Sequence, residues 1–231
     1  MAHVVSRLVG VVLAVAVLLT VSPAIPASSV AAGSQQWSGT YNLYRPGVFV
    51  TQYTWTWCVG ASAQAMLNII NDTSNDSRRR QRRLVTYAMN NDEHFDSNSG
   101  GSDAVGFART LTRHGGGRYA PVAAPTYRKA VRWAVKQLRR TGRPVGLLVK
   151  GGRHAWVLTG FDATADPART NRFTITHVYV MGPLYPKQTK GWYDKPPNTR
   201  ISWRQFKQPF RRFDDPDSPR FVGYWVTVNP Y

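Results

Sequence analysis

The hydrophobic pattern of the first half of the chain predicts helices. Apolar residues recur at three- and four-residue spacing over 61–70, 102–114 and 127–140. A further helix, ending near Met89, is expected to start at Asp76 or Ser77, because both residue types cap helices well.

The second half changes to short apolar runs that predict strands. Four runs have this character: 144–150, 154–160, 173–180 and 221–228. A short helix over 202–210 lies between the last two. Helices followed by an antiparallel meander indicate an α+β fold. The chain shows no internal repeat, heptad run or linker that would divide it.

Residues 1–32 have the pattern of a secretory signal peptide. His3 and Arg7 precede an apolar run from Leu8 to Val21, and small residues follow. The run has 14 residues, fewer than the roughly 20 that span a bilayer as a helix. We therefore expect a secreted protein without a membrane span after cleavage, in which residues 33–231 form a single domain.

The charge balance is strongly basic. The formal net charge is +18, and it becomes +17 without residues 1–32, because that segment holds one basic residue and no acidic one. Such a surface favours polyanions: nucleic acid, an anionic cell-wall polymer or anionic lipid. The alternative is a highly charged surface that serves only solubility.

Five arginines, here named the arginine cluster, form the densest basic patch: Arg78, Arg79, Arg80, Arg82 and Arg83. The cluster is either a grip for a polyanion or a solvated helix face. It lacks the interleaved aromatic residues of single-strand nucleic-acid sites, and the chain has no dedicated nucleic-acid motif.

Cys58 is the only cysteine, which excludes an internal disulfide and any zinc site built from several thiolates. The histidines show no metal-binding spacing, so we expect no metal and no cofactor. An unpaired thiol is easily lost in an oxidising space. A single cysteine in an exported protein is therefore expected to be either fully buried or functional.

Cys58 lies where β-branched and aromatic residues give way to a helical pattern. The N–H groups and the positive dipole end of a helix start favour thiolate over thiol. Gln52, six residues upstream, can direct its amide to the same place. With the Cys58 N–H it would hold the oxyanion of an acyl-transfer intermediate. The alternative is a small buried hydrophobe.

His154 supplies the second half of this chemistry. It opens a predicted strand directly after a glycine turn. An imidazole beside a thiol takes the thiol proton, stabilises the thiolate and later protonates the leaving amine. A lone histidine in a strand is more often structural, but its combination with Cys58 and Gln52 favours catalysis.

The motifs around these residues resemble those of papain-like cysteine peptidases, most closely the bacteriocin-processing, double-glycine-type branch. The first motif is Gln52-x5-Cys58 with GAS and MLN after it, and the second reads GRHAWVLTGFD over 152–162. Weaker similarity extends to VYVMGPL over 178–184 and ISWRQF over 201–206.

The resemblance implies a papain-like fold, with a helical N-terminal half whose central nucleophile helix packs on a C-terminal antiparallel sheet. It also implies roles for three residues. Cys58 is the nucleophile, His154 is the base and acid, and Gln52 is the oxyanion donor.

One position departs from this family pattern. The family usually has Asp or Asn just after the third strand to orient the histidine, and here the residue is Gly182. Asp162 lies at the far end of the strand of His154, more than ~20 Å away at ~3.3 Å per residue. Either a Cys-His dyad works with a carbonyl or water as orienter, or the site is degenerate.

These observations leave two main hypotheses. The first is a secreted thiol hydrolase that cleaves a peptide or isopeptide bond in a peptide or protein substrate, with acyl transfer to an amine equally open. The second is a catalytically degenerate module that binds an anionic polymer or a cell-wall partner through its basic surface. An immunity or interaction protein with a vestigial site ranks below both.

Overall fold

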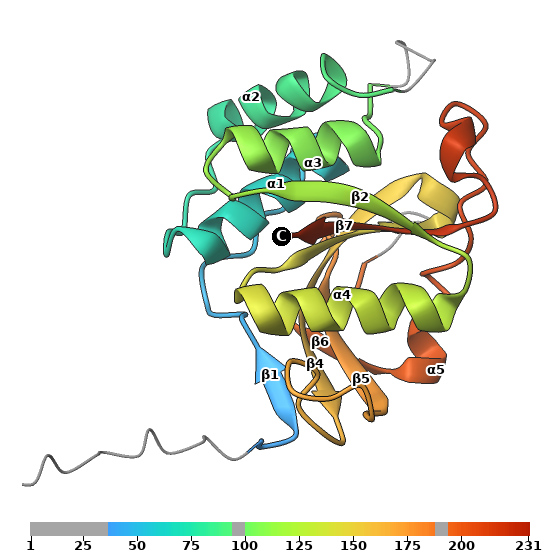
Figure 1. Cartoon of the computed structure of the whole chain (residues 1–231). Coiled ribbons are helices and arrows are strands. Elements are labelled where there is room, and N and C mark those ends of the chain that lie inside the picture. The colour runs from blue at the N-terminus through green and yellow to red at the C-terminus, as the bar shows by residue number, and fades with distance from the viewer. Residues whose placement is uncertain (1–36, 94–99, 188–193) are drawn as a thin grey trace, which may run out of the picture. The chain divides into compact units, whose positions relative to one another are not determined.

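An antiparallel sheet forms the centre of the computed structural model, which describes residues 37–93, 100–187 and 194–231 (Figure 1). Within these residues, six strands are ordered β2-β7-β3-β4-β5-β6, and a seventh, β1, pairs with the end of β4. The strands are β1 (Thr40–Asn42), β2 (Tyr119–Ala124), β3 (Val145–Val149), β4 (His154–Ala163), β5 (Ile175–Met181), β6 (Thr199–Ser202) and β7 (Trp225–Pro230). The predicted signal peptide lies outside the described residues.

Helices cover both faces of this sheet (Figure 1). They are α1 (Cys58–Ile70), α2 (Arg78–Met89), α3 (Ala104–Arg113), α4 (Tyr127–Thr141) and α5 (Trp203–Phe206), with 3-10 turns η1 (Lys150–Gly152) and η2 (Pro219–Phe221). Successive side chains of a strand point to opposite faces. Ala155 and Val157 of β4 therefore pack with α1, α2 and α3, whereas Trp156 and Leu158 pack with α4 and α5.

This arrangement confirms the predicted α+β class, with helices that begin at Cys58 packed on a C-terminal antiparallel sheet. The strands β1, β2 and β6 were not predicted. Two of them are only three and four residues long, and β2 contains Pro121, so neither length nor alternation marked them. The N-cap of α3 is Asp103, whose carboxylate accepts from the N–H groups of Val105 and Gly106, so this helix begins at Ala104 within the predicted range 102–114. In the described part of the chain, no helix is long and apolar enough to cross a membrane.

Helix α1 is the element that brings the nucleophile candidate to the sheet. Ten of its residues, from Val59 to Asn68, are buried. The Ser62 hydroxyl donates a hydrogen bond of 3.1 Å to the Ala155 carbonyl, next to His154 in β4. The start of α1 is thereby held against the start of β4, and the two candidate catalytic residues are each the first residue of their element.

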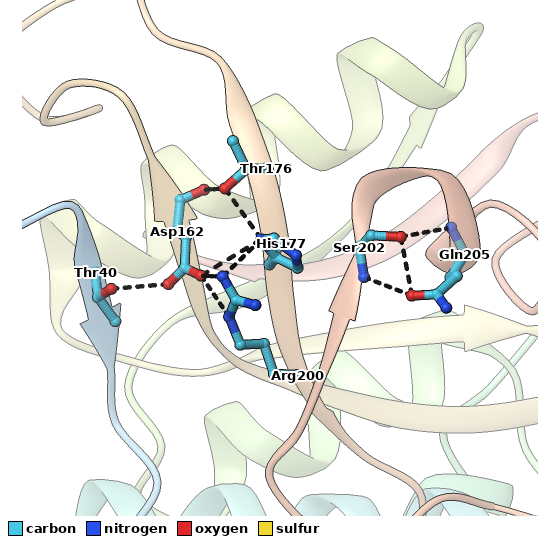
Figure 2. A network of polar contacts seen from close by, with 7 residues as sticks. All are labelled: Thr40, Asp162, Thr176, His177, Arg200, Ser202 and Gln205. Carbon is cyan, nitrogen blue, oxygen red and sulfur yellow. Dashed lines mark hydrogen bonds and ion pairs between the residues drawn. The ribbon is translucent and has the colours of Figure 1, made fainter.

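The far end of β4 carries a polar network with a different purpose (Figure 2). Asp162 accepts from the Thr40 hydroxyl at 2.8 Å and from Arg200 Nε at 2.7 Å, and Arg200 also donates to His177 Nδ1 at 2.9 Å. These contacts join β1, β4, β5 and β6. Asp162 and His177 therefore hold the sheet together and do not orient His154. Figure 2 also shows the Ser202–Gln205 capping box that starts α5.

Candidate active site

The three residues singled out by sequence line one cleft. Gln52, Cys58 and His154 all contribute to its wall, and its volume is about 510 Å³. The structure thus brings together three side chains that are up to 102 positions apart in the sequence.

Cys58 and His154 are in direct contact in this cleft. The Cys58 sulfur forms a hydrogen bond with the His154 ring and accepts from the backbone N–H groups of Val59 and Ala155. The N–H of Val59 belongs to the first turn of α1, where backbone donors have no partner within the helix. The helix start and the strand start therefore both direct donors at the same sulfur.

These contacts change the ionisation of both side chains. Burial opposes ionisation of the thiol, but the hydrogen bond and charge of His154 outweigh it, so the Cys58 pKa lies below its ordinary value. Burial likewise disfavours the imidazolium, but hydrogen bonds to Asp194 and Cys58 raise the His154 pKa to about 9. Both shifts favour the thiolate–imidazolium form of the pair over the neutral form.

Asp194 completes the arrangement, and sequence analysis missed it. Its carboxylate is buried and lies 2.8 Å from His154 Nε2. It also accepts from Trp156 Nε1 and from the Leu184 N–H, each at 2.8 Å. Because Nε2 of the imidazole is hydrogen-bonded to the carboxylate, Nδ1 is the ring nitrogen that remains for Cys58. Burial raises the Asp194 pKa, but the contacts with His154 outweigh this and lower it overall, so the carboxylate is charged.

Gly182 explains how Asp194 reaches this place. A Cβ atom at Gly182 would lie 2.3 Å from Asp194 Cγ and 2.5 Å from Trp156 Nε1. The position where the family pattern expects an Asp or Asn is thus the space that the Asp194 carboxylate fills. The expectation of a missing carboxylate was wrong, because the group comes from a later part of the chain.

A signal for Asp194 was present in the sequence. Between the end of β5 and the start of β6, the chain contains a single acidic residue, Asp194. Its separation of 12 residues from Gly182 gave no geometric reason to place it beside His154, because the intervening proline-rich segment has no regular period.

Gln52 lines the cleft, but its amide is engaged elsewhere. Nε2 donates to the carbonyls of Thr54 at 2.8 Å and Trp55 at 3.0 Å. Oε1 is buried and has no hydrogen-bond partner among the described residues. To donate to an oxyanion, Gln52 has to turn one N–H away from its own loop. The Cys58 N–H precedes the first hydrogen bond of α1, from Ala61 N–H to the Trp57 carbonyl, and is a donor with no acceptor in the helix.

Residues 37–93, 100–187 and 194–231 hold no group of three or more His, Cys, Asp or Glu side chains that could bind a metal ion.

A cysteine at a helix start, a histidine at the start of a central strand of an antiparallel sheet and a carboxylate behind the histidine define the papain-like class of cysteine peptidases. The chain belongs to the Peptidase_C39 like family, whose sequence profile matches residues 48–212.

Other comparisons add little. No curated protein matches the chain. One similar solved structure is the crystal structure of UfSP from C. elegans, with 14% sequence identity and a TM-score of 0.41. The match covers 76% of this chain but only 30% of the worm protein, so the chain spans less than a third of that relative.

Proposed function

We propose that the protein is a secreted thiol hydrolase that cleaves a peptide or isopeptide bond, with Cys58 as nucleophile, His154 as acid and base, and Asp194 as positioning residue. The observation that carries the proposal is the continuous contact from sulfur to imidazole to carboxylate. Membership of a peptidase family supports a peptide substrate. Secretion rests on the pattern of residues 1–32 alone.

The proposed reaction follows from the protonation states. The Cys58 thiolate attacks the carbonyl carbon of the scissile bond, and the negative charge moves to the carbonyl oxygen. The Cys58 N–H and a reoriented Gln52 amide stabilise this oxyanion. The His154 imidazolium then gives its proton to the leaving amine, which leaves a thioester. Water, deprotonated by His154, hydrolyses the thioester; an amine in its place would give acyl transfer.

The first test is alkylation of the only thiol by iodoacetamide at mildly acidic pH. We expect Cys58 in the wild type to react well below pH 8, because its thiolate persists there. His154→Ala should slow this labelling by at least about tenfold, because a rise of one unit in the thiol pKa already lowers the thiolate fraction by that factor. If Cys58 does not react, or reacts equally fast in His154→Ala, the proposed pair is wrong.

The second test separates the oxyanion donor from the nucleophile. Gln52→Ala should leave the alkylation of Cys58 unchanged, because alkylation creates no oxyanion. Peptide hydrolysis should fall by about 10²- to 10³-fold, the usual effect of removing one oxyanion donor. Equal hydrolysis by the wild type and the variant would exclude Gln52 from this role.

The alternative of a degenerate binding module rested mainly on Gly182. Asp194 supplies the carboxylate that Gly182 lacks, so the glycine no longer supports degeneration. Two results together would favour the alternative. The wild type and Cys58→Ser would bind an anionic polymer equally well, and the wild type would cleave none of the peptides in a mixed library.

A further inference from the structure

The arginine cluster lies on α2, and no acidic side chain among the described residues pairs with it. Four of its five side chains are exposed, and Arg80 is half-buried. None of the ion pairs and none of the side-chain hydrogen bonds formed among the described residues involves a guanidinium of the cluster. Arg139 and Arg200, in contrast, each pair with a carboxylate. Five positive charges are therefore concentrated within six residues of one helix without neutralisation among the described residues.

The tertiary structure supplies the aromatic residues that the helix itself lacks. Tyr53, Trp55 and Trp57 belong to the turn before α1, and Tyr53 and Trp57 contact arginines of α2. The Arg78 guanidinium carbon is 5.9 Å from the centroid of the Tyr53 ring, and that of Arg82 is 5.9 Å from the centroid of a Trp57 ring. Tyr53 is 43% exposed and Trp55 is 59% exposed. Arginines and aromatic rings thus share one surface, although more than 20 residues separate them in sequence.

A buried side chain fixes this surface in place. Gln81, on the inner side of α2, accepts from the Tyr53 N–H at 2.8 Å and donates to the Thr51 carbonyl at 3.2 Å. The Tyr53 hydroxyl also donates to the Asp76 carbonyl just before α2, at 3.0 Å. The turn and the helix are therefore held together by three polar contacts and do not depend on the exposed arginines.

The positive charges of the cluster also affect a neighbouring histidine, His114. His114, at the end of α3, is in edge contact with Tyr87 of α2. Partial burial and then the charges of Arg80, Arg83 and Arg113 lower the His114 pKa below its ordinary value. A bound anion would reverse the electrostatic part of this effect.

We propose that the arginine cluster, together with Tyr53 and Trp55, binds single-stranded nucleic acid, with guanidiniums on the phosphates and the two exposed rings stacked on bases. A positive surface that follows a backbone, combined with exposed aromatic rings, is the general design of such sites. Stacking needs unpaired bases, so a duplex is a poorer ligand. Because Trp55 also lines the catalytic cleft, a bound strand lies at the mouth of that cleft.

The choice of ligand rests on two features beyond charge. All five cations are arginines and none is a lysine, which favours bidentate contacts with phosphate and stacking on rings. Two large aromatic side chains, Tyr53 and Trp55, are exposed on the turn that contacts α2, and a polyanion without bases would leave them unused. The proposal does not depend on peptidase activity, so the binding test can fail while the hydrolase proposal stands, and the reverse.

The test uses the full chain and a fluorescent oligothymidylate of about 20 nucleotides, with binding measured by anisotropy at several salt concentrations. Five phosphate contacts predict that log K falls against log salt with a slope of about −3.5, from about −0.7 per contact. Arg79→Gln combined with Arg83→Gln should reduce the slope to about −2.1. Arg128→Gln with Arg140→Gln removes two exposed charges from α4 and should leave the slope near −3.5.

A second pair of variants tests stacking. Trp55→Ala should weaken oligothymidylate binding by about 5- to 100-fold, whereas Trp133→Ala should not weaken it. Trp133 is the matched control, because it is 46% exposed on α4. Circular dichroism of all variants, and Cys58 alkylation of the arginine variants, should match the wild type.

Several outcomes would overturn the proposal. Equal losses for the two arginine pairs would mean that only net charge matters. Inorganic polyphosphate that competes as strongly as oligothymidylate, with no effect of Trp55→Ala, would indicate a surface for anions without bases. Tighter binding to phosphatidylglycerol vesicles than to the oligonucleotide would indicate a lipid surface.

Discussion

The absence of a side chain at Gly182 creates the space in which Asp194 meets His154. The Asp194 carboxylate lies 2.8 Å from three donors, so its charge is well compensated in a buried place. One of these donors, Trp156, follows His154 by two residues in β4 and fixes the carboxylate relative to the strand. The geometry at His154 therefore depends on a small residue at one position and an acidic residue at another.

This dependence can be tested by moving the carboxylate. Gly182→Ala should displace Asp194 and behave like Asp194→Ala, with slower hydrolysis and a higher thiol pKa. The upper limit is about 10⁴-fold in rate, the cost of replacing the aspartate of a serine triad. We expect a smaller loss here, because the lowered Cys58 pKa favours the thiolate before substrate binds.

The double variant Gly182→Asp with Asp194→Gly puts the carboxylate where the family pattern has it. We expect the double variant to hydrolyse peptide at least about tenfold faster than Asp194→Gly alone. Rates are measured on the best peptide found for the wild type, with thermal melting as the check on folding. No recovery in a folded double variant would show that position 182 cannot serve His154.

The ionisation of the pair predicts the pH dependence of the reaction. Hydrolysis requires the thiolate, which is lost as the pH falls through the Cys58 pKa, below its ordinary value. It also requires the imidazolium, which is lost as the pH rises through about 9, the His154 pKa. Peptide hydrolysis should therefore fall on both sides. Alkylation needs only the thiolate and should not fall above pH 9. A decline of alkylation in step with hydrolysis at alkaline pH would contradict this assignment.

At the level of elements, the contact between α1 and α2 places both the nucleophile and the arginine cluster. Gly60, two residues after Cys58, permits it: a Cβ there would lie 2.8 Å from Val85 Cβ and 3.0 Å from the Gln81 carbonyl oxygen. The helices approach at this point more closely than an alanine would allow. The same contact holds Gln81 against the turn before α1.

Gly60→Ala should therefore destabilise the protein. Alanine in a helix gains about 1 kcal/mol over glycine, but overpacking a tight contact typically costs 1–3 kcal/mol. We expect a net loss of about 1 kcal/mol in the free energy of unfolding, measured with urea. Thr86→Ala on the exposed side of α2 raises helix propensity without this contact and should not destabilise. If Gly60→Ala is more stable than the wild type, α1 and α2 can move apart enough to fit the added methyl group without a cost in packing.

Element positions followed from sequence where local signals were strong. Caps and apolar spacing placed α1, α2 and α4 to within a few residues, and β-branched or apolar runs placed β3, β4 and β5. The short strands β1 and β6 have no such signal, because their pairing partners lie far away in the chain. They exist because neighbouring strands offer unpaired backbone groups.

At the scale of the whole molecule, segments outside the family match complete the sheet. The match covers residues 48–212, whereas β1 precedes it and β7 follows it. β7 lies between β2 and β3, inside the sheet. Trp37 stacks on Phe161 with ring centroids 5.8 Å apart and donates to the Ala163 carbonyl at 2.8 Å. Residues Trp37–Tyr231 form one compact unit.

Two shortened chains test how much of this unit is needed. A chain that starts at Trp37 should melt like the longer protein and keep its Cys58 alkylation rate. A chain that starts at Val48 loses Trp37 and β1, including the Thr40–Asp162 hydrogen bond (Figure 2). It should melt at least about 5 °C lower, because 1 kcal/mol corresponds to about 2–4 °C at this size. Equal melting temperatures would show that β1 contributes nothing to stability.

Sequence alone determined the features that depend on neighbours in the chain. The helix start at Cys58, the strand start at His154 and the α+β class follow from caps, periods and turns within about ten residues. The tertiary structure decided which distant groups meet. Asp194 reaches His154 through the space at Gly182, and Tyr53 and Trp57 contact the arginines of α2. Contacts of this kind depend on packing between elements, and packing leaves no period in the sequence from which it could be predicted.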